Sequence, residues 1–141
     1  MASDTEKMMN DYLEATNAHD VEKILTFFTD GAVYECTPVG MVSRGKKEIK
    51  DFLSSMFVDF PDFKLEMKLG FNAGERGAGE WVMSGTFAHS SNSGMPATGK
   101  SFSVRGATIT EFSGGKISRN TNYWNLASFL QQVGLMPPPP K

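Results

Sequence analysis

The spacing of hydrophobic residues changes once along the chain, near Pro61. Before this proline, apolar positions recur every three to four residues in three segments, a pattern typical of amphipathic helices. A capping residue precedes the first two segments, and a break around Ser43-Arg44-Gly45 precedes the third. The predicted helices run from Ser3 or Asp4 to Ala18, from Asp20 to Phe28, and from Gly45 to Phe60.

Beyond Phe63, apolar and polar residues alternate, as expected for strands with one buried face. The alternation predicts four long strands, at residues 63–71, 81–89, 100–112 and 116–125, with a tight turn at Ser113-Gly114-Gly115 joining the last two as a hairpin. A shorter strand is predicted at residues 32–37 and a short closing helix at 126–133. Three helices followed by antiparallel strands indicate an α+β fold in which helices cover one face of a curved sheet.

Length and composition indicate one compact domain. The chain has 141 residues and 40% hydrophobic content, which suits a single core. We expect the domain to span residues 1–136 and to be followed by a Pro-rich tail at 137–141, where four consecutive prolines favour an extended backbone.

Charge and cysteine content exclude several classes of function. A formal net charge of −2 leaves no basic excess for nucleic acid. The single cysteine, Cys36, excludes an internal disulfide and a zinc-type cysteine cluster, so we expect no metal and no cofactor. Residues 1–7 lack the pattern of a signal peptide and no membrane-length apolar run occurs, so the expected location is cytoplasmic, without membrane association.

Five short motifs then point to a family. They are Asn17-Ala18-His19-Asp20, Phe60-Pro61-Asp62-Phe63, Gly94–Lys100, Gly115-Lys116-Ile117 and Leu130–Leu135. In this order, the chain resembles the SnoaL-like polyketide cyclases of the nuclear-transport-factor-2-like superfamily over nearly its whole length. The resemblance implies a cone-shaped α+β barrel with three N-terminal helices, a short C-terminal helix, a deep apolar pocket and a homodimer formed through the outer sheet face.

The resemblance also locates the residues that would carry chemistry. In the cyclases an aspartate follows the isoleucine of the Gly-Lys-Ile turn by five positions, and here that position is Asn122. The family's supporting histidine falls at Thr108 and a neighbouring glutamine at Gly106. An amide has no proton to exchange near pH 7, so the acid/base step of the cyclases is not supported at this position.

Two related enzyme classes on this fold match less well. The ketosteroid isomerases use a tyrosine on the first helix, which Tyr12 matches, but their base falls at Cys36 or Thr37 and their second oxyanion acid near Thr108. Tyr12 therefore reads either as an oxyanion donor or as a packed phenol with a satisfied hydroxyl. Epoxide hydrolases need inward aspartates that the last two strands do not supply.

Strand alternation predicts which side chains face the pocket. If Asn122 points inward, so do Asn120 and Trp124. Inward positions on the preceding strands are Trp81, Met83, Phe87, His89, Phe102, Val104, Gly106, Thr108 and Thr110. Arg105 falls on the outer face. His89 is a candidate base at the pocket mouth or a solvated loop residue, and Glu35 is a second candidate base only if it is buried.

These observations lead to three hypotheses. The first is a cyclase- or isomerase-type enzyme acting on a hydrophobic carbonyl compound, with Asn122, His89 and Tyr12 positioned to act on it. The second is a non-catalytic protein that binds a small lipophilic ligand, and a third is a dimeric accessory domain whose outer sheet is the functional surface. The predicted ligand-binding residues are Trp81, Met83, Phe87, Phe52, Met56, Phe102, Thr108, Asn120 and Trp124.

Overall fold

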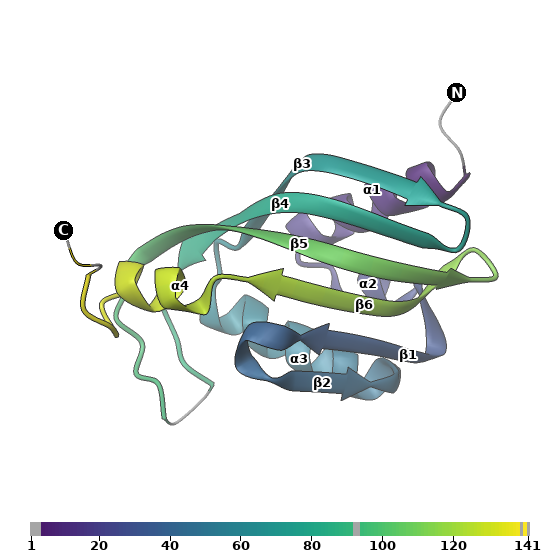
Figure 1. The fold of residues 1–141 in the computed structure, drawn as a ribbon. Helices are drawn as coiled ribbons and strands as arrows, with labels where there is room; N and C mark the ends of the chain where they lie inside the picture. The colour runs from purple at the N-terminus through teal and green to yellow at the C-terminus, as the bar shows by residue number, and fades with distance from the viewer. Residues whose placement is uncertain (1–3, 92–93, 139, 141) are drawn as a thin grey trace.

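A computed structural model describes residues 4–91, 94–138 and 140 of the chain. Its helices are α1 (Asp4–Asn17), α2 (Val21–Leu25), α3 (Gly45–Asp59) and α4 (Leu126–Gln132), with a 3-10 turn η1 (Thr37–Val39). Its strands are β1 (Phe28–Cys36), β2 (Met41–Arg44), β3 (Lys64–Ala73), β4 (Arg76–Thr86), β5 (Ser101–Ser113) and β6 (Lys116–Trp124). Three helices, α1 to α3, lie against one side of the sheet (Figure 1). The predicted α+β architecture, including the short C-terminal helix, is confirmed.

The sheet has six strands in the order β2-β1-β6-β5-β4-β3. Strands β3 to β6 form an antiparallel meander, as the alternation predicted. The first strand, β1, instead pairs with β6 in parallel, so the expectation of a wholly antiparallel sheet is wrong at this point. This pairing sets Tyr34 beside Asn120 and Cys36 beside Asn122.

The second helix is shorter than its apolar pattern predicted. Asp20 caps it as expected, accepting a hydrogen bond from the Lys23 N–H at 3.1 Å, but the helix ends at Leu25. Phe28 starts β1 instead, where its side chain is fully buried and the strand pairs with β6 opposite Ile117. Apolar residues at helical spacing cannot by themselves distinguish this arrangement from a longer helix, since both bury the same side chains.

Strand β2 and turn η1 were not predicted. Pro38 and Gly40 were expected only to break the first strand, yet residues 37–44 fold back so that β2 pairs with β1. Gly40 adopts a positive φ of 68°, which glycine accepts without strain. Strand β4 also begins at Arg76, five residues before the expected start, and ends at Thr86, before the predicted limit at His89.

Two predictions lie wholly or partly outside the described residues. Ser3, the alternative cap of the first helix, is one of them, and Asp4 is the first helical residue that the structure describes. The Pro-rich tail is described at residues 137, 138 and 140 only. Within the described segments, each helix is too short or too polar to traverse a lipid bilayer.

One side chain joins α1 to the edge of the sheet. The Asn17 amide donates to the Leu65 carbonyl at 2.9 Å and accepts from the Leu65 N–H at 2.7 Å. It therefore replaces a neighbouring strand for one residue of β3. A second contact holds the helix hairpin at the same end, because the His19 Nε2 lies 2.8 Å from the Phe63 carbonyl and the imidazole stacks on Phe57.

Replacing Asn17 with Leu is expected to lower the free energy of unfolding by about 1–3 kcal/mol, because the substitution removes two hydrogen bonds and leaves backbone groups of Leu65 unpaired. Urea unfolding followed by circular dichroism measures the change. Glu14→Ala, an exposed change on the same helix, serves as the control and should alter stability by less than about 0.5 kcal/mol. Equal stabilities for the two variants would show that the contact does not hold α1 in place.

Candidate functional site

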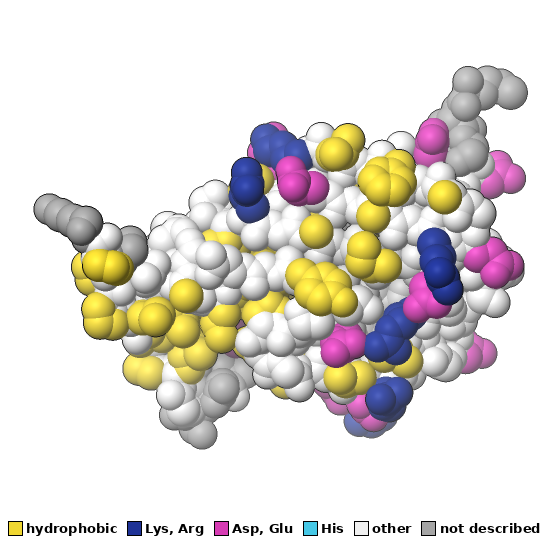
Figure 2. Space-filling view, viewed as in Figure 1, with side chains coloured by type: hydrophobic (Ala, Val, Ile, Leu, Met, Phe, Trp, Pro, Cys, Tyr) yellow, Lys and Arg dark blue, Asp and Glu magenta, His cyan; other side chains and the backbone are white. Residues whose placement is uncertain are grey.

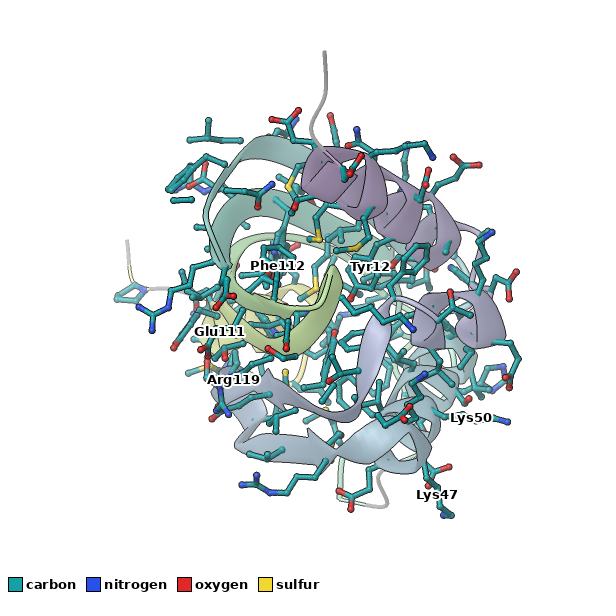
Figure 3. The ribbon with its side chains drawn as sticks, turned by 90° about the vertical axis from the view of Figure 1, so that its right-hand side faces the viewer. Tyr12, Lys47, Lys50, Glu111, Phe112 and Arg119 are labelled. Carbon is teal, nitrogen blue, oxygen red and sulfur yellow. The ribbon has the colours of Figure 1, made fainter. Side chains whose placement is uncertain are left out.

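A large cavity lies between the helices and the concave face of the sheet. Its volume is about 1160 Å³, slightly more than the roughly 300–1,000 Å³ of most small-molecule sites. Helices α1 and α3 form one wall and the inward faces of β1 and β3 to β6 form the other. Figure 3 shows Tyr12 between α1 and the curved strands, with Glu111 and Arg119 on the outer side of the sheet.

The structure brings the predicted pocket residues together, with one exception. The cavity is lined by Tyr12, Phe52, Met56, Trp81, Met83, Phe87, Phe102, Thr108, Asn120, Asn122 and Trp124. His89 is exposed, follows the end of β4 and is not among the lining residues. Its predicted inward orientation is therefore wrong, because the strand alternation stops at Phe87.

Glu35 is also removed as a candidate base. Its carboxylate lies on the outer face of the sheet and accepts a hydrogen bond from the Arg119 guanidinium at 2.7 Å. The alternate residue on β1, Cys36, points inward and lines the cavity. This arrangement follows from strand geometry, since neighbouring side chains point to opposite faces.

A chain of hydrogen bonds crosses the deep end of the cavity. The Trp81 indole N–H donates to the Thr108 hydroxyl at 2.8 Å, and that hydroxyl donates to the Asn122 Oδ1 at 2.7 Å. The Asn122 amide nitrogen then donates to the Glu35 carbonyl at 3.3 Å. These groups connect strands β4, β5 and β6 to β1.

The indole takes its position because Gly106 has no side chain. A β-carbon at Gly106 would lie 2.3 Å from the Trp81 ring, far closer than carbon atoms approach. The ring therefore lies against the bare backbone of β5 at Gly106, which is the register partner of Trp81. In this chain the indole occupies the space where the resemblance placed a glutamine.

Tyr12 and Asn120 form a second polar pair. The Asn120 amide nitrogen donates to the Tyr12 hydroxyl at 3.1 Å, which leaves the phenolic proton for another acceptor. The carbonyl oxygen of Asn120 is buried and has no hydrogen-bond partner among the described residues. Edge-to-face contacts with Phe27 and Phe28 fix the Tyr12 ring.

The ionisable groups at this end of the cavity stay neutral. Burial raises the pKa of Tyr12 above its usual value, although the hydrogen bond from Asn120 opposes the shift. Burial also raises the pKa of Tyr34 and that of the Cys36 thiol. At neutral pH these three groups can donate hydrogen bonds but carry no charge.

Tyr34 and Asp59 are among the lining residues that were not recognised from the sequence. Tyr34 belongs to the unexpectedly long β1, so its orientation could not be assigned. Asp59 follows Met56 by three residues and Phe52 by seven. This helical spacing is the signal that could have placed it on the inward face of α3. Its half-buried carboxylate lines the cavity and accepts a hydrogen bond from the Ser91 hydroxyl at 2.8 Å.

Metal binding has no visible support. Among residues 4–91, 94–138 and 140, no three His, Cys, Asp or Glu side chains lie close enough together to hold an ion. The carboxylates that line the cavity, those of Glu6, Glu48, Asp51 and Asp59, form no such group. Its amides, hydroxyls and indole are weak ligands for divalent metals.

Solved structures of several other proteins share this fold. A protein from Pseudomonas putida, provisionally described as a polyketide cyclase, superposes with a TM-score of 0.80 at 23% identity, over 94% of this chain and 98% of that one. TsrD from Streptomyces laurentii gives 0.82 at 20% identity, over 94% and 96%. A Catenulispora acidiphila protein with a ketosteroid isomerase-like fold gives 0.78 at 20% identity, over 91% and 92%.

At these identities the solved structures establish the fold alone. A comparison with curated proteins gave no significant match. The sequence model of the SnoaL-like polyketide cyclases, however, matches residues 6–133, which is most of the chain. The chain therefore belongs to the SnoaL-like polyketide cyclase family.

Proposed function

We propose that this protein binds a small, neutral, hydrophobic compound that carries a carbonyl group. The observation that supports the proposal most directly is the uncharged, hydrogen-bonding floor at the end of an apolar cavity. Aromatic and methionine side chains such as Phe52, Met56 and Phe102 offer surface for flat rings, and methionine adapts to varied shapes. Neutral donors at the floor then orient a ligand oxygen without the cost of burying a charge.

Catalysis is a second candidate function, and Asp59 is the observation that favours it. An enzyme that shifts or condenses carbonyl compounds must remove a proton next to the carbonyl. In place of the family aspartate stands Asn122, which can only donate or accept hydrogen bonds. Of the four described carboxylates that line the cavity, Glu6, Glu48 and Asp51 are exposed and Asp59 is half-buried. Asp59 is therefore the candidate base for a cyclase- or isomerase-type reaction.

The ligand proposal predicts that fluorene and 9-fluorenone, two flat apolar probes, both stabilise the protein. At ten times the dissociation constant the stabilisation is about 1.4 kcal/mol, which thermal unfolding detects as a shift of several degrees. Met56→Arg places a charge in the apolar wall and should weaken binding at least tenfold by isothermal titration calorimetry. Val58→Arg, at an exposed position two residues away on the same helix, should bind as the wild type does.

The affinity for fluorene should also stay constant between about pH 6 and 8.5, because the raised pKa values keep Tyr12, Tyr34 and Cys36 protonated throughout this interval. Absence of binding by both probes, or an undiminished affinity in Met56→Arg, would refute a hydrophobic ligand site in this cavity.

The catalytic candidate predicts proton exchange at carbon. In deuterated buffer, the protein should accelerate exchange of the α-protons of 2-indanone, followed by NMR. Asp59→Asn should slow the protein-dependent exchange by about 10²–10⁴-fold while fluorene binding is retained, because only the base is lost. Asp11→Asn, which alters a carboxylate paired with Lys7 outside the cavity, is the matched control. An exchange rate equal to that in buffer alone would leave binding as the function and discard this one.

We also propose that the outer sheet face joins two copies of the chain. Exposed apolar side chains cross this face, where Leu69 and Phe71 are each 63% exposed, Tyr123 is 50% and Ile109 is 45% (Figure 2). These side chains form a continuous surface, because Phe71 is the register partner of Ala78 and Ala78 is the register partner of Ile109. Exposed apolar surface of this kind, edged by charges, is typical of an interface.

The dimer proposal predicts a solution mass of twice the 15.5 kDa of one chain, measured by light scattering after size exclusion. Ile109→Lys should give the monomer mass, because two lysines would face one another or bury without partners in a two-fold interface. Val58→Lys, on the opposite side of the molecule, should leave the dimer intact. A wild-type protein that stays monomeric at a protein concentration of about 100 µM would contradict the proposal.

A further inference from the structure

The hydrogen-bond chain at the cavity floor has a fixed direction. An indole N–H can donate but cannot accept, so the Thr108 hydroxyl must accept from Trp81. The Glu35 carbonyl can only accept, so the Asn122 NH₂ group faces it and the Asn122 Oδ1 faces Thr108, which donates its one proton there. The receiving atom at Asn122 must then be its carbonyl oxygen, because the amide nitrogen does not accept.

This direction determines which donors at the floor remain for a ligand. The acceptor of Asn122 is occupied by Thr108, and its NH₂ group lies toward the Glu35 carbonyl and the Tyr34 hydroxyl. A hydrogen bond from Asn122 to Tyr34 leaves the Tyr34 proton for a partner in the cavity. The groups at this end of the cavity are therefore N–H and O–H donors.

The unpaired acceptor nearby does not change this. The Asn120 carbonyl oxygen has no partner, but less than 1 Å² of its surface is accessible, so a ligand atom cannot touch it. The Asn120 nitrogen donates to Tyr12, whose own proton also remains available to the cavity. Asn120 and Asn122 thus each donate to a tyrosine hydroxyl and leave the proton of that hydroxyl for a ligand.

We propose that Thr108 is a positioning residue that sets the ligand specificity of the floor. Held by Trp81, it turns the Asn122 amide so that the floor favours a carbonyl-type acceptor. It disfavours a hydroxyl, because the oxygens of Thr108, Tyr12 and Tyr34 already accept hydrogen bonds. The ligand class is then a flat neutral compound with a carbonyl oxygen at its buried end. This inference rests on the proposed binding function and narrows it.

Three compounds with one ring system test the inference: 9-fluorenone carries a carbonyl, 9-fluorenol a hydroxyl, and fluorene neither. Isothermal titration calorimetry of the wild-type protein should give fluorenone about tenfold tighter binding than fluorene, and fluorenol no gain over fluorene. Equal affinities for all three would overturn the specificity inference while leaving the hydrophobic site intact. Failure of all three to bind would instead overturn the proposed function itself.

Variants of the chain separate positioning from simple packing. Thr108→Val keeps the shape of the side chain but releases the Asn122 amide, so the preference for fluorenone over fluorenol should fall to about twofold or less. Thr108→Ser restores the hydroxyl and should restore the preference. Trp81→Phe removes the first donor and should weaken the preference as Thr108→Val does, whereas Ser103→Val, at an exposed position on the outer face of β5, should retain it.

Asn122→Asp supplies the opposite result. It replaces the NH₂ donor beside Tyr34 with an acceptor oxygen, so at a pH at which this carboxyl is ionised fluorenol should bind more tightly than fluorenone. Affinity ratios within one variant do not depend on its stability, so a modest loss of folding does not obscure the outcome. An unchanged preference for fluorenone in Thr108→Val or in Asn122→Asp would refute the role assigned to Thr108.

Discussion

The contact of the Trp81 indole with the bare backbone at Gly106 is the constraint on which the interior depends. Because Gly106 has no side chain, the largest ring of β4 can lie flat against β5 and still bring its N–H to Thr108. Any other residue at this position would push the ring toward the helices and into the cavity. One glycine therefore maintains both the volume of the cavity and the start of the hydrogen-bond chain.

The parallel pairing of β1 with β6 completes the same region from the other side. It places Tyr34 and Cys36 beside Asn120 and Asn122, where the Thr37 hydroxyl also donates to the Asn122 carbonyl of the main chain at 2.8 Å. Strand β1 and the turn that follows it thereby supply polar groups to the deep end of the cavity. An isolated antiparallel hairpin of β5 and β6 would leave Asn120 and Asn122 without these neighbours.

The sequence predicted those parts of the site that lie on regular, two-sided strands. On β5 and β6 one inward residue fixes all the others, so Phe102, Thr108, Asn120 and Trp124 were assigned correctly to the cavity. Strand alternation did not locate the ends of strands, as Phe28 and His89 show. Local spacing does not show which long-range partner a segment will pair with, and only that partner decides whether Phe28 continues a helix or starts a strand.

The neutral floor has a further physical consequence for chemistry. A carboxylate at position 122 would receive a hydrogen bond from Thr108, yet burial beside Tyr34 and Cys36 would raise its pKa, which is the condition that a general acid or base requires. The amide in its place retains the same neighbours and orientation but removes the titration. Fixed dipoles therefore stand where a titrating group would lie. Such dipoles stabilise a ligand oxygen and any negative charge that develops on it, but they cannot remove a proton. Asn122 on its own therefore supports recognition, and any catalysis depends on a carboxylate at the cavity wall such as Asp59.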